Sequence, residues 1–411
     1  MASVVVVLNA GSSSLKFKLF EDCGDAEPRL VLQGAIEGVG GPARFAVRDT
    51  ANNVLDEGIV ADSAVSHEDA LLHLIGWLTR HKDGHTLVAV GHRVVHGGDL
   101  YAGPVRVDDA VLSSLHALAP LAPLHQPHNL KPIEAIQRRM PDLPQIACFD
   151  TAFHRTQPEI AQMFALPRSF WDQGVKRYGF HGLSYQYIAS ALAQYEPRLV
   201  PGRVIVAHLG NGASLCALKQ GQSIATTMGF SALDGVPMGT RCGAIDPAVI
   251  FHMLRSMKLG PEEAERILYT QSGLLGVSGL SNDMRKLRAD EATNARARQA
   301  IDLFIYRITR EIGALMAILG GLDALIFTAG IGENDVATRA EIIANLGWTG
   351  LAVDAVANQA GRPLISMGTG PTAWIIPTNE ELVIARQVRD VLRSAQSQSK
   401  HSGSVDAGGT T

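Results

Sequence analysis

Runs of β-branched apolar residues alternate with short glycine-rich stretches along this chain. Residues 4–8 (VVVVL) indicate a buried strand, and residues 16–20, where polar and apolar positions alternate, indicate a half-exposed one. Between them lie residues 9–14 (NAGSSS), a run of small hydrogen-bonding residues typical of a turn. The pattern therefore predicts a strand–turn–strand unit near the start of the sequence.

A similar unit begins 200 residues later. Residues 204–207 predict a β-branched strand, and a glycine turn at 210–212 (GNG) leads into a second strand. At this offset four positions are identical, namely Val4/Val204, Val6/Val206, Ser14/Ser214 and Leu15/Leu215. Four identities also arise by chance, but two copies of one unit favour a duplication that gives two similar domains facing one another.

Further elements follow from the same periodicities. Strands are predicted at 30–36, 43–47 and 87–90, and a helix at about 66–81 with Ser66 as its N-cap. A strand at 325–328, a glycine turn at 330–332 (GIG) and a helix at 336–346 form a strand–turn–helix unit that suits phosphate. The last helix is predicted at about 381–394. Residues 395–411, rich in Ser, Gln and Gly, are predicted to be disordered.

Composition narrows the class of protein. A chain of 411 residues favours two large domains. A net charge of −4 gives no electrostatic reason to expect nucleic acid or an anionic membrane as a partner. The apolar stretch at 312–327 is interrupted by Asp323, which predicts a buried helix leading into a strand and not a membrane span. The four cysteines form no CxxC pair and no secretory signal is recognised, so we expect a reducing, cytoplasmic location.

The chemistry is narrowed by motifs that the sequence lacks. It contains no GxxxxGK[ST] loop, no HRD or DFG set typical of protein kinases, and no HExxH. Phosphoryl transfer to a carboxylate would need none of these. Such an acceptor is already ionised at neutral pH, so the requirement is for Mg²⁺ and cationic side chains that bring an anion to a polyphosphate.

Nine motifs in one order resemble those of the acetate kinase family. They span residues 4 to about 390 and read NAGSSSLKF, GHRVVHGG, LAPLHQPHNL, CFDTAFH, RYGFHG, HLGNGAS, MGTRCGAIDP, FTAGIGEN and IPTNEELVIA. The resemblance implies an α/β fold of two duplicated actin/hexokinase-like (ribonuclease H-like) domains with a cleft between them. It places an N-terminal domain at 1–150, onto which helix 382–394 packs back, a nucleotide-binding domain at 151–381, and a disordered tail at 395–411.

The same resemblance implies an activity. The γ-phosphoryl group of ATP would pass reversibly to acetate, giving acetyl phosphate and ADP, by direct in-line attack of the carboxylate. It also implies Mg²⁺, with Mn²⁺ as a substitute, a cytoplasmic homodimer, and neither nucleic acid nor membrane as a partner. Two alternatives stay open: a propionate or butyrate kinase, and an actin-like ATPase that acts as a conformational switch.

The resemblance implies catalytic roles for several residues, and each of these residues could instead have an ordinary structural role. Arg93 and Arg241 would face the acetate and the transferring phosphoryl group, although most arginines form structural ion pairs. His181 would donate to an equatorial phosphoryl oxygen, and His125 and His208 are weaker candidates of the same kind. Asp150, after the strand 146–149, would orient the arginines or a water near Mg²⁺.

Metal and nucleotide sites are assigned in the same way. Asn9 and Glu380 would hold Mg²⁺, with the adjacent Glu381 as the competing choice. The residues expected to bind ATP lie in the first turn and strand and in the segments 208–212, 283–285 and 330–334: Ser12, Ser14, Lys16, His208, Leu209, Gly210, Asn211, Gly212, Asp283, Met284, Arg285, Gly330, Ile331, Gly332, Glu333 and Asn334.

The acyl pocket is expected to be small and apolar. By resemblance it is formed by Val95, Leu124, Phe180 and Ala232. The family pattern has proline at position 232, and it differs from this chain at four other motif positions, where the chain has Leu183, Tyr185, Cys242 and Ala244. None of these differences removes a proposed catalytic group, but Ala232 bears on the acyl-chain length.

Overall fold

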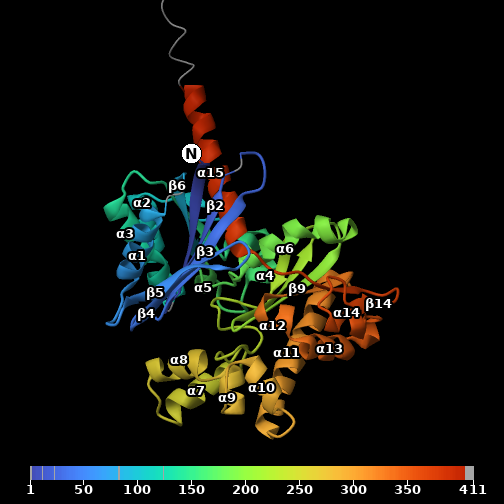
Figure 1. Cartoon of the computed structure of the whole chain (residues 1–411). Coiled ribbons are helices and arrows are strands. Elements are labelled where there is room, and N and C mark those ends of the chain that lie inside the picture. Colours follow the sequence, from blue (N-terminus) through green and yellow to red (C-terminus); the bar gives the residue numbers. More distant parts are fainter. Residues whose placement is uncertain (1, 12, 23, 82–83, 124, 403–411) are drawn as a thin grey trace, which may run out of the picture. The chain divides into compact units, whose positions relative to one another are not determined.

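The computed structural model in Figure 1 describes residues 2–11, 13–22, 24–81, 84–123 and 125–402. The chain divides into two compact units. Unit 1 contains the residues up to Ala152 and those from Asn379 onward, and unit 2 is Phe153–Thr378. The boundaries predicted from the sequence, after residues 150 and 381, lie close to these divisions.

Unit 1 is built on an eight-stranded sheet in the order β5-β4-β3-β2-β1-β6-β8-β7. Its strands are β1 (Ala2–Ala10), β2 (Ser14–Glu21), β3 (Arg29–Glu37), β4 (Ala43–Asp49), β5 (Val54–Ala61), β6 (His85–Val94), β7 (Val105–Arg106) and β8 (Gln145–Phe149). Its helices are α1 (His67–Arg80), α2 (Asp109–Ala117), α3 (Gln126–Arg139) and α15 (Glu380–Ser402).

Helices cover both faces of the central strand β1. Val4, Val6 and Leu8 pack in one core cluster with residues of α1 and α3, such as Leu71 and Ile136. On the other face α15 packs on β1 and β6, so closely that a Cβ built at Gly91 would lie 2.6 Å from Ile384. This two-sided burial explains why β1 is a continuous apolar run.

Unit 2 has a five-stranded sheet in the order β11-β10-β9-β12-β15 and a separate pair, β13 and β14. The strands are β9 (Arg203–Leu209), β10 (Ala213–Lys219), β11 (Gln222–Thr226), β12 (Ala324–Thr328), β13 (Ala352–Val353), β14 (Ser366–Met367) and β15 (Thr372–Ile375). The helices are α4 (Glu159–Gln162), α5 (Arg168–Asp172), α6 (Gly182–Tyr195), α7 (Pro247–Arg255), α8 (Pro261–Thr270), α9 (Gly273–Ser278), α10 (Met284–Asp290), α11 (Ala295–Leu319), α12 (Ala329–Asn334), α13 (Val336–Asn345) and α14 (Ala355–Gln359).

The two sheets share a five-stranded core, which confirms the predicted duplication. The order β3-β2-β1-β6-β8 in unit 1 matches β11-β10-β9-β12-β15 in unit 2, and each pair of neighbours runs in the same relative direction. The four identities at an offset of 200 residues are weaker evidence for this duplication. Val4 pairs with Glu21, 17 residues on, whereas Val204 pairs with Leu218, 14 residues on. The second hairpin is therefore shorter. If Val4 and Val6 occupy the same structural positions as Val204 and Val206, then Ser14 and Leu15 cannot occupy the same positions as Ser214 and Leu215.

Two elements differ from their predictions. Residues 330–332, expected to form a turn, lie in the helix α12, and the left-handed residue that turns the chain is Ala329, with φ +64°. Glu333 holds this bend because its Oε1 accepts hydrogen bonds from the backbone N–H groups of Ala329 (2.8 Å) and Thr378 (3.1 Å).

The second difference is the length of α15. The helix extends to Ser402, beyond the predicted end at 394, since no glycine or proline interrupts residues 380–402. The rest of the predicted tail, 403–411, lies outside the described residues. Along the described chain no helix is both long and apolar enough to span a membrane.

Candidate functional site

In unit 1, charged groups meet where two parallel strands end. Arg93 lies at the end of β6, and Asp150 directly follows its neighbour β8. The guanidinium donates from Nε to Oδ1 of Asp150 (3.0 Å) and from Nη2 to Oδ2 (2.6 Å). Asp150 is only 1% exposed. A bidentate pair of this kind fixes the plane of the guanidinium.

Two neighbouring carboxylates on the first turn of α15 differ in their partners. Glu381 forms an ion pair with Nζ of Lys18 at 2.9 Å, whereas the closest cation to Glu380 is Nη1 of Arg93, 3.9 Å away. Burial raises the pKa of Glu380 to about 7, opposed by Arg93 and reinforced by Asp150 and Glu381. Burial also works to lower the pKa of Arg93, but Asp150 and Glu380 outweigh it, so that pKa is raised.

With every group ionised, this cluster carries one more negative charge than positive charge. Asp150, Glu380 and Glu381 face two cations, Arg93 and Lys18. In the described parts of the chain no group of three or more His, Cys, Asp or Glu side chains forms a metal cage. Mg²⁺ commonly binds through one or two carboxylates together with substrate phosphates and waters. A carboxylate without its own cation therefore fits Mg²⁺ that arrives bound to a nucleotide. Glu380 is the better candidate for this metal site, because Glu381 is already paired with Lys18.

Buried amides missed by the sequence analysis hold the loops around this cluster. Oδ1 of Asn129 accepts from the N–H of Val95 (2.9 Å), and its Nδ2 donates to the carbonyl of Ala10 (2.7 Å). Asn129 thus ties the residue after β6 to the end of β1. The available signal was a pair of amides, Gln126 and Asn129, at the start of an otherwise apolar helix face.

The remaining residues predicted for unit 1 lie in its strands, after β6 and at the start of α3. Asn9 lies in β1 opposite Lys16 of β2, and Ser14 is the first residue of β2. Val95 is buried, and His125 occupies the N-cap position of α3. Ser12 and Leu124 lie outside the described residues.

In unit 2, two stacked histidines form the centre of a hydrogen-bonded cluster. The rings of His181 and His208 lie 4.1 Å apart, 20° from parallel. Nδ1 of His181 is 2.8 Å from Oγ of Ser214, and Nδ1 of His208 is 2.9 Å from Oγ of Ser184. His181 adopts a left-handed conformation, φ 58°, at the N-cap of α6. Such a backbone is unusual for a residue other than glycine, which shows that the ring is held in place by its surroundings.

The glycine turn after β9 lies against His181 and Arg241. A Cβ built on Gly212 would be 3.3 Å from Nε2 of His181 and 4.0 Å from Nη1 of Arg241. Arg241 in turn donates from Nη1 to the carbonyl of Ala232 at 3.1 Å. Unit 2 therefore gathers His181, Arg241 and a turn with glycine at its first and third positions at one place, where a polyanion could meet both donors.

A cavity of about 1020 Å³ opens beside this turn in unit 2. Residues predicted to bind ATP line it, namely Gly210, Asn211, Asp283, Met284, Arg285, Gly330, Ile331 and Asn334. Its lining does not include five other described residues of the predicted segments: His208, Leu209, Gly212, Gly332 and Glu333. Glu333 instead anchors the start of α12, as described above, and Leu209 belongs to the core.

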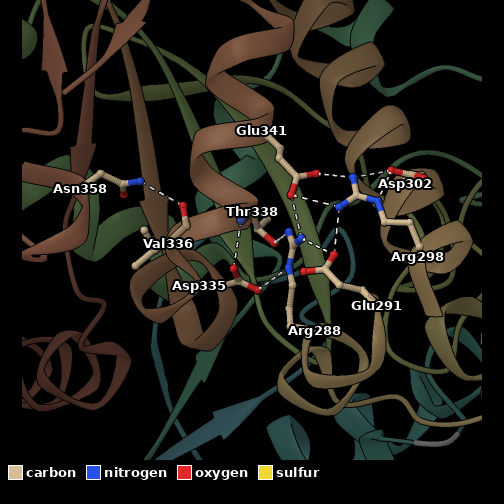
Figure 2. Close-up of polar contacts among 9 residues, drawn as sticks. All are labelled: Arg288, Glu291, Arg298, Asp302, Asp335, Val336, Thr338, Glu341 and Asn358. Atoms are coloured by element: carbon tan, nitrogen blue, oxygen red, sulfur yellow. Dashed lines mark hydrogen bonds and ion pairs between the residues drawn. The ribbon is translucent and has the colours of Figure 1, made fainter. Parts of the chain in front are cut away.

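An ion-pair network that the sequence patterns did not predict lies at one wall of the cavity (Figure 2). Arg288, which lines the cavity, contacts Asp335 (3.4 Å) and Glu341 (2.7 Å) and donates to Oγ1 of Thr338 (2.9 Å). Arg298, from α11, pairs with Glu291, Asp302 and Glu341 at 2.6 to 2.9 Å. These contacts join α10 and the segment after it to α11 and α13.

Comparison with known proteins agrees with this arrangement. The model of the acetokinase family matches residues 4–386. The chain belongs to the acetokinase family. The acetate kinase of Rhodopseudomonas palustris is 50% identical over 396 residues, covering 94% of this chain and 98% of that one.

Solved structures of the family are similar over nearly the whole chain. A propionate kinase from Francisella tularensis is 35% identical with a TM-score of 0.87, and the acetate kinase of Porphyromonas gingivalis is 34% identical with a TM-score of 0.85. The two matches cover 94% and 95% of this chain and 98% and 100% of those chains.

Within this acetokinase chain, the departures from the family pattern are built into the fold. Sγ of Cys242 lies 3.1 Å from the carbonyl of Gly243 and packs against a small core of α7 and α8. The N–H of Ala244 donates to the carbonyl of Gly235. Tyr185 is fully buried, and its hydroxyl contacts Ser214. Cys148, Cys216 and Cys242 form no disulfide, and Cys23 lies outside the described residues.

Proposed function

We propose that this chain transfers the γ-phosphoryl group of ATP to acetate, giving acetyl phosphate and ADP. An oxygen of the acetate carboxylate forms the new bond to the γ-phosphorus, and the bond from that phosphorus to the ADP oxygen breaks. The observation that carries the proposal is the guanidinium of Arg93, fixed by Asp150 beside Glu380, a largely buried carboxylate that has no cation of its own. Curated acetate kinases at 40–50% identity support the same reaction.

The residues divide between the two substrates. Arg93 binds the acetate carboxylate. Arg241 and His181 donate to the oxygens of the transferring phosphoryl group, where charge redistributes in the transition state. Glu380, with Asn9, holds Mg²⁺, which neutralises phosphate charge when it is bound with ATP. No general base is needed, because the acceptor is already ionised.

The cavity in unit 2 takes the nucleotide. Backbone N–H groups beside Gly210 and Gly330 suit the phosphates. The wall near Glu291 and Asp335 carries carboxylates that are paired with Arg288 and can also accept hydrogen bonds from ribose hydroxyls or an adenine amino group. These acceptors favour a nucleotide whose base and sugar lie at that wall.

The finer features of the family also belong to this proposal. We propose a cytoplasmic homodimer that uses Mg²⁺ and accepts Mn²⁺. Sedimentation equilibrium measures the mass of the particle directly, and a monomer at micromolar concentration would contradict the dimer.

One assay separates this function from that of an ATPase switch. Purified protein with Mg²⁺ and ATP should release ADP only when acetate is present, and acetyl phosphate should form in equal amount. The variant Arg241→Ala should lower kcat by about 10²–10⁴ while remaining folded. ADP release that does not depend on acetate would favour the switch.

Propionate is the second candidate substrate, since Ala232 stands where the family pattern has proline. Proline carries two more ring carbons, and a buried CH₂ is worth about 0.8 kcal/mol. Ala232→Pro should therefore lower the propionate-to-acetate ratio of kcat/KM by a few-fold. An unchanged ratio would mean that residue 232 does not set acyl length.

A further inference from the structure

Two buried hydroxyl groups connect the core of unit 2 to the ring of His181. The hydroxyl of Tyr185, on the first turn of α6, hydrogen-bonds Oγ of Ser214 in β10. The same Oγ lies 2.8 Å from Nδ1 of His181. Tyr185 and Ser214 are both 0% exposed. The three groups form one continuous chain that ends on the imidazole.

The hydrogens of this chain can run in either direction, because each hydroxyl can donate or accept. Tyr185 and Ser214 each carry one hydroxyl hydrogen. When Tyr185 donates to Ser214, the hydrogen of Ser214 is directed to Nδ1 of His181. Nδ1 then accepts, so a neutral imidazole must carry its hydrogen on Nε2. Nε2 is the nitrogen that lies beside Gly212, on the side of Arg241.

We propose that Tyr185 is a positioning residue that, acting through Ser214, keeps His181 in the tautomer whose Nε2–H is a donor. The catalytic consequence rests on the function proposed above, in which that N–H contacts the transferring phosphoryl group. The stack on His208 fixes the plane of the ring, and the hydroxyl chain fixes which nitrogen carries the hydrogen.

The test removes one oxygen atom. In ¹⁵N-histidine-labelled protein, the ring nitrogens of His181 should report hydrogen on Nε2 alone. Tyr185→Phe should give a mixture of the two tautomers. Its kcat should fall about 2- to 10-fold, the effect of losing one hydrogen bond. KM for ATP and for acetate should stay within about 2-fold, since the donor acts on the reacting group.

Two further variants control the experiment. Tyr195→Phe makes the same change at the other end of α6, next to Trp374, and should alter neither the ring nitrogens nor kcat. Ser214→Ala breaks the chain at its middle and should reproduce the nitrogen signals of Tyr185→Phe. Because Tyr185 acts through Ser214, adding Tyr185→Phe to Ser214→Ala should lower kcat no further. If Tyr185→Phe does not fold, Ser214→Ala reports on the same chain.

The outcomes separate the two proposals. Unchanged ring nitrogens in Tyr185→Phe and Ser214→Ala, or effects of the two substitutions on kcat that multiply in the double variant, would overturn the role of Tyr185. A lower Tm with unchanged kcat and nitrogen signals would make Tyr185 purely structural. The nitrogen signals need no turnover, so they decide the point even if acetate-dependent ADP release fails, which would refute the proposed function instead.

Discussion

Each unit holds an arginine among several carboxylates, yet the two clusters differ in burial. In unit 1, Asp150 and Glu380 are 1% and 14% exposed around Arg93. In unit 2, the carboxylates around Arg288 and Arg298 include Glu341 at 30% and Asp302 at 56%. The second cluster has more ion pairs, but most of its charges keep contact with water, which screens them.

The pKa values move in opposite directions. Burial raises the pKa of Glu380 to about 7, and Arg93 and Lys18, which are paired with Asp150 and Glu381, do not offset it. Burial also works to raise the pKa of Glu341, but hydrogen bonds from Arg298 and Arg288 outweigh it, and that pKa is lowered. A complete network stabilises its own ions, whereas a buried carboxylate without its own cation indicates a missing ligand. The number of ion pairs alone would have selected the cluster in unit 2, and not the Arg93 cluster that we propose as the reaction centre.

The strongest test of this contrast is Arg93→Ala. Removing the guanidinium should lower kcat by about 10²–10⁴. It leaves Asp150 buried without its cation, so the free energy of unfolding should fall by about 3–5 kcal/mol. Steady-state kinetics and urea unfolding measure the two effects. Arg93→Lys keeps the charge but not the two-pronged geometry, and should recover stability more fully than kcat. Activity within tenfold of wild type in Arg93→Ala would contradict the role of Arg93.

Glu380→Gln should raise the Mg²⁺ concentration for half-maximal activity about 10-fold or more, with little change in the KM for acetate. The matched control is Glu381→Gln, which loses a charge already paired with Lys18 and should change the Mg²⁺ requirement far less. The reverse result would transfer the metal role to Glu381, the alternative that the sequence left open.

The pH dependence sharpens the same test. The folded pKa of Glu380 lies above its ordinary value of 4.5, so between pH 4.5 and about 7 the folded protein keeps a proton that the unfolded chain has released. Its contribution to the stability of the metal-free protein therefore falls as pH rises through that range, by up to about 1.4 kcal/mol per pH unit. Glu380→Gln should lose this slope. As the pH falls below 7, the Mg²⁺ concentration needed for half-maximal activity should rise more steeply in wild type than in Glu380→Gln. The variant serves as the control, because protonation of ATP affects both proteins equally.

Sequence patterns predicted the positions of the strands better than they predicted which charged residues contact one another. The β-branched runs of β1 and β9 were recognisable because burial on both faces demands them. Glycines at 330–332 suggested a turn, but Glu333 closes the bend one residue earlier and the glycines enter a helix. Arg93, Asp150 and Arg241 were predicted from motifs, and their roles stay predictions. Arg288 was missed, since its partners Asp335 and Glu341 lie about 50 residues away and look like ordinary charges of a helix surface.

A smaller effect is expected from Arg288→Met, which removes the charge and keeps most of the volume. Arg288 lines the nucleotide cavity and holds α10 to α13, so KM for ATP should rise about 2- to 10-fold while KM for acetate stays constant. Stability should fall by about 1–3 kcal/mol, since hydrogen bonds to charged groups are lost. Initial rates with each substrate varied in turn give the two KM values. A rise in the KM for acetate alone would remove Arg288 from the nucleotide site.

Arg298→Met should have the smallest effect. Arg298 shares Glu291 and Glu341 with Arg288, but its side chain is 40% exposed, against 13% for Arg288, and it does not line the cavity. Exposed ion pairs contribute about 0–1 kcal/mol, so the loss in unfolding free energy should lie in that range and shrink further at about 1 M salt. KM for ATP should not change, because Arg288 alone still joins α10 to α13. If Arg298→Met raised KM for ATP as much as Arg288→Met does, the carboxylates that the two arginines share would be transmitting the effect. The network would then act as one unit in binding the nucleotide. The difference in exposed fraction between Arg288 and Arg298 would not tell which of them supports nucleotide binding.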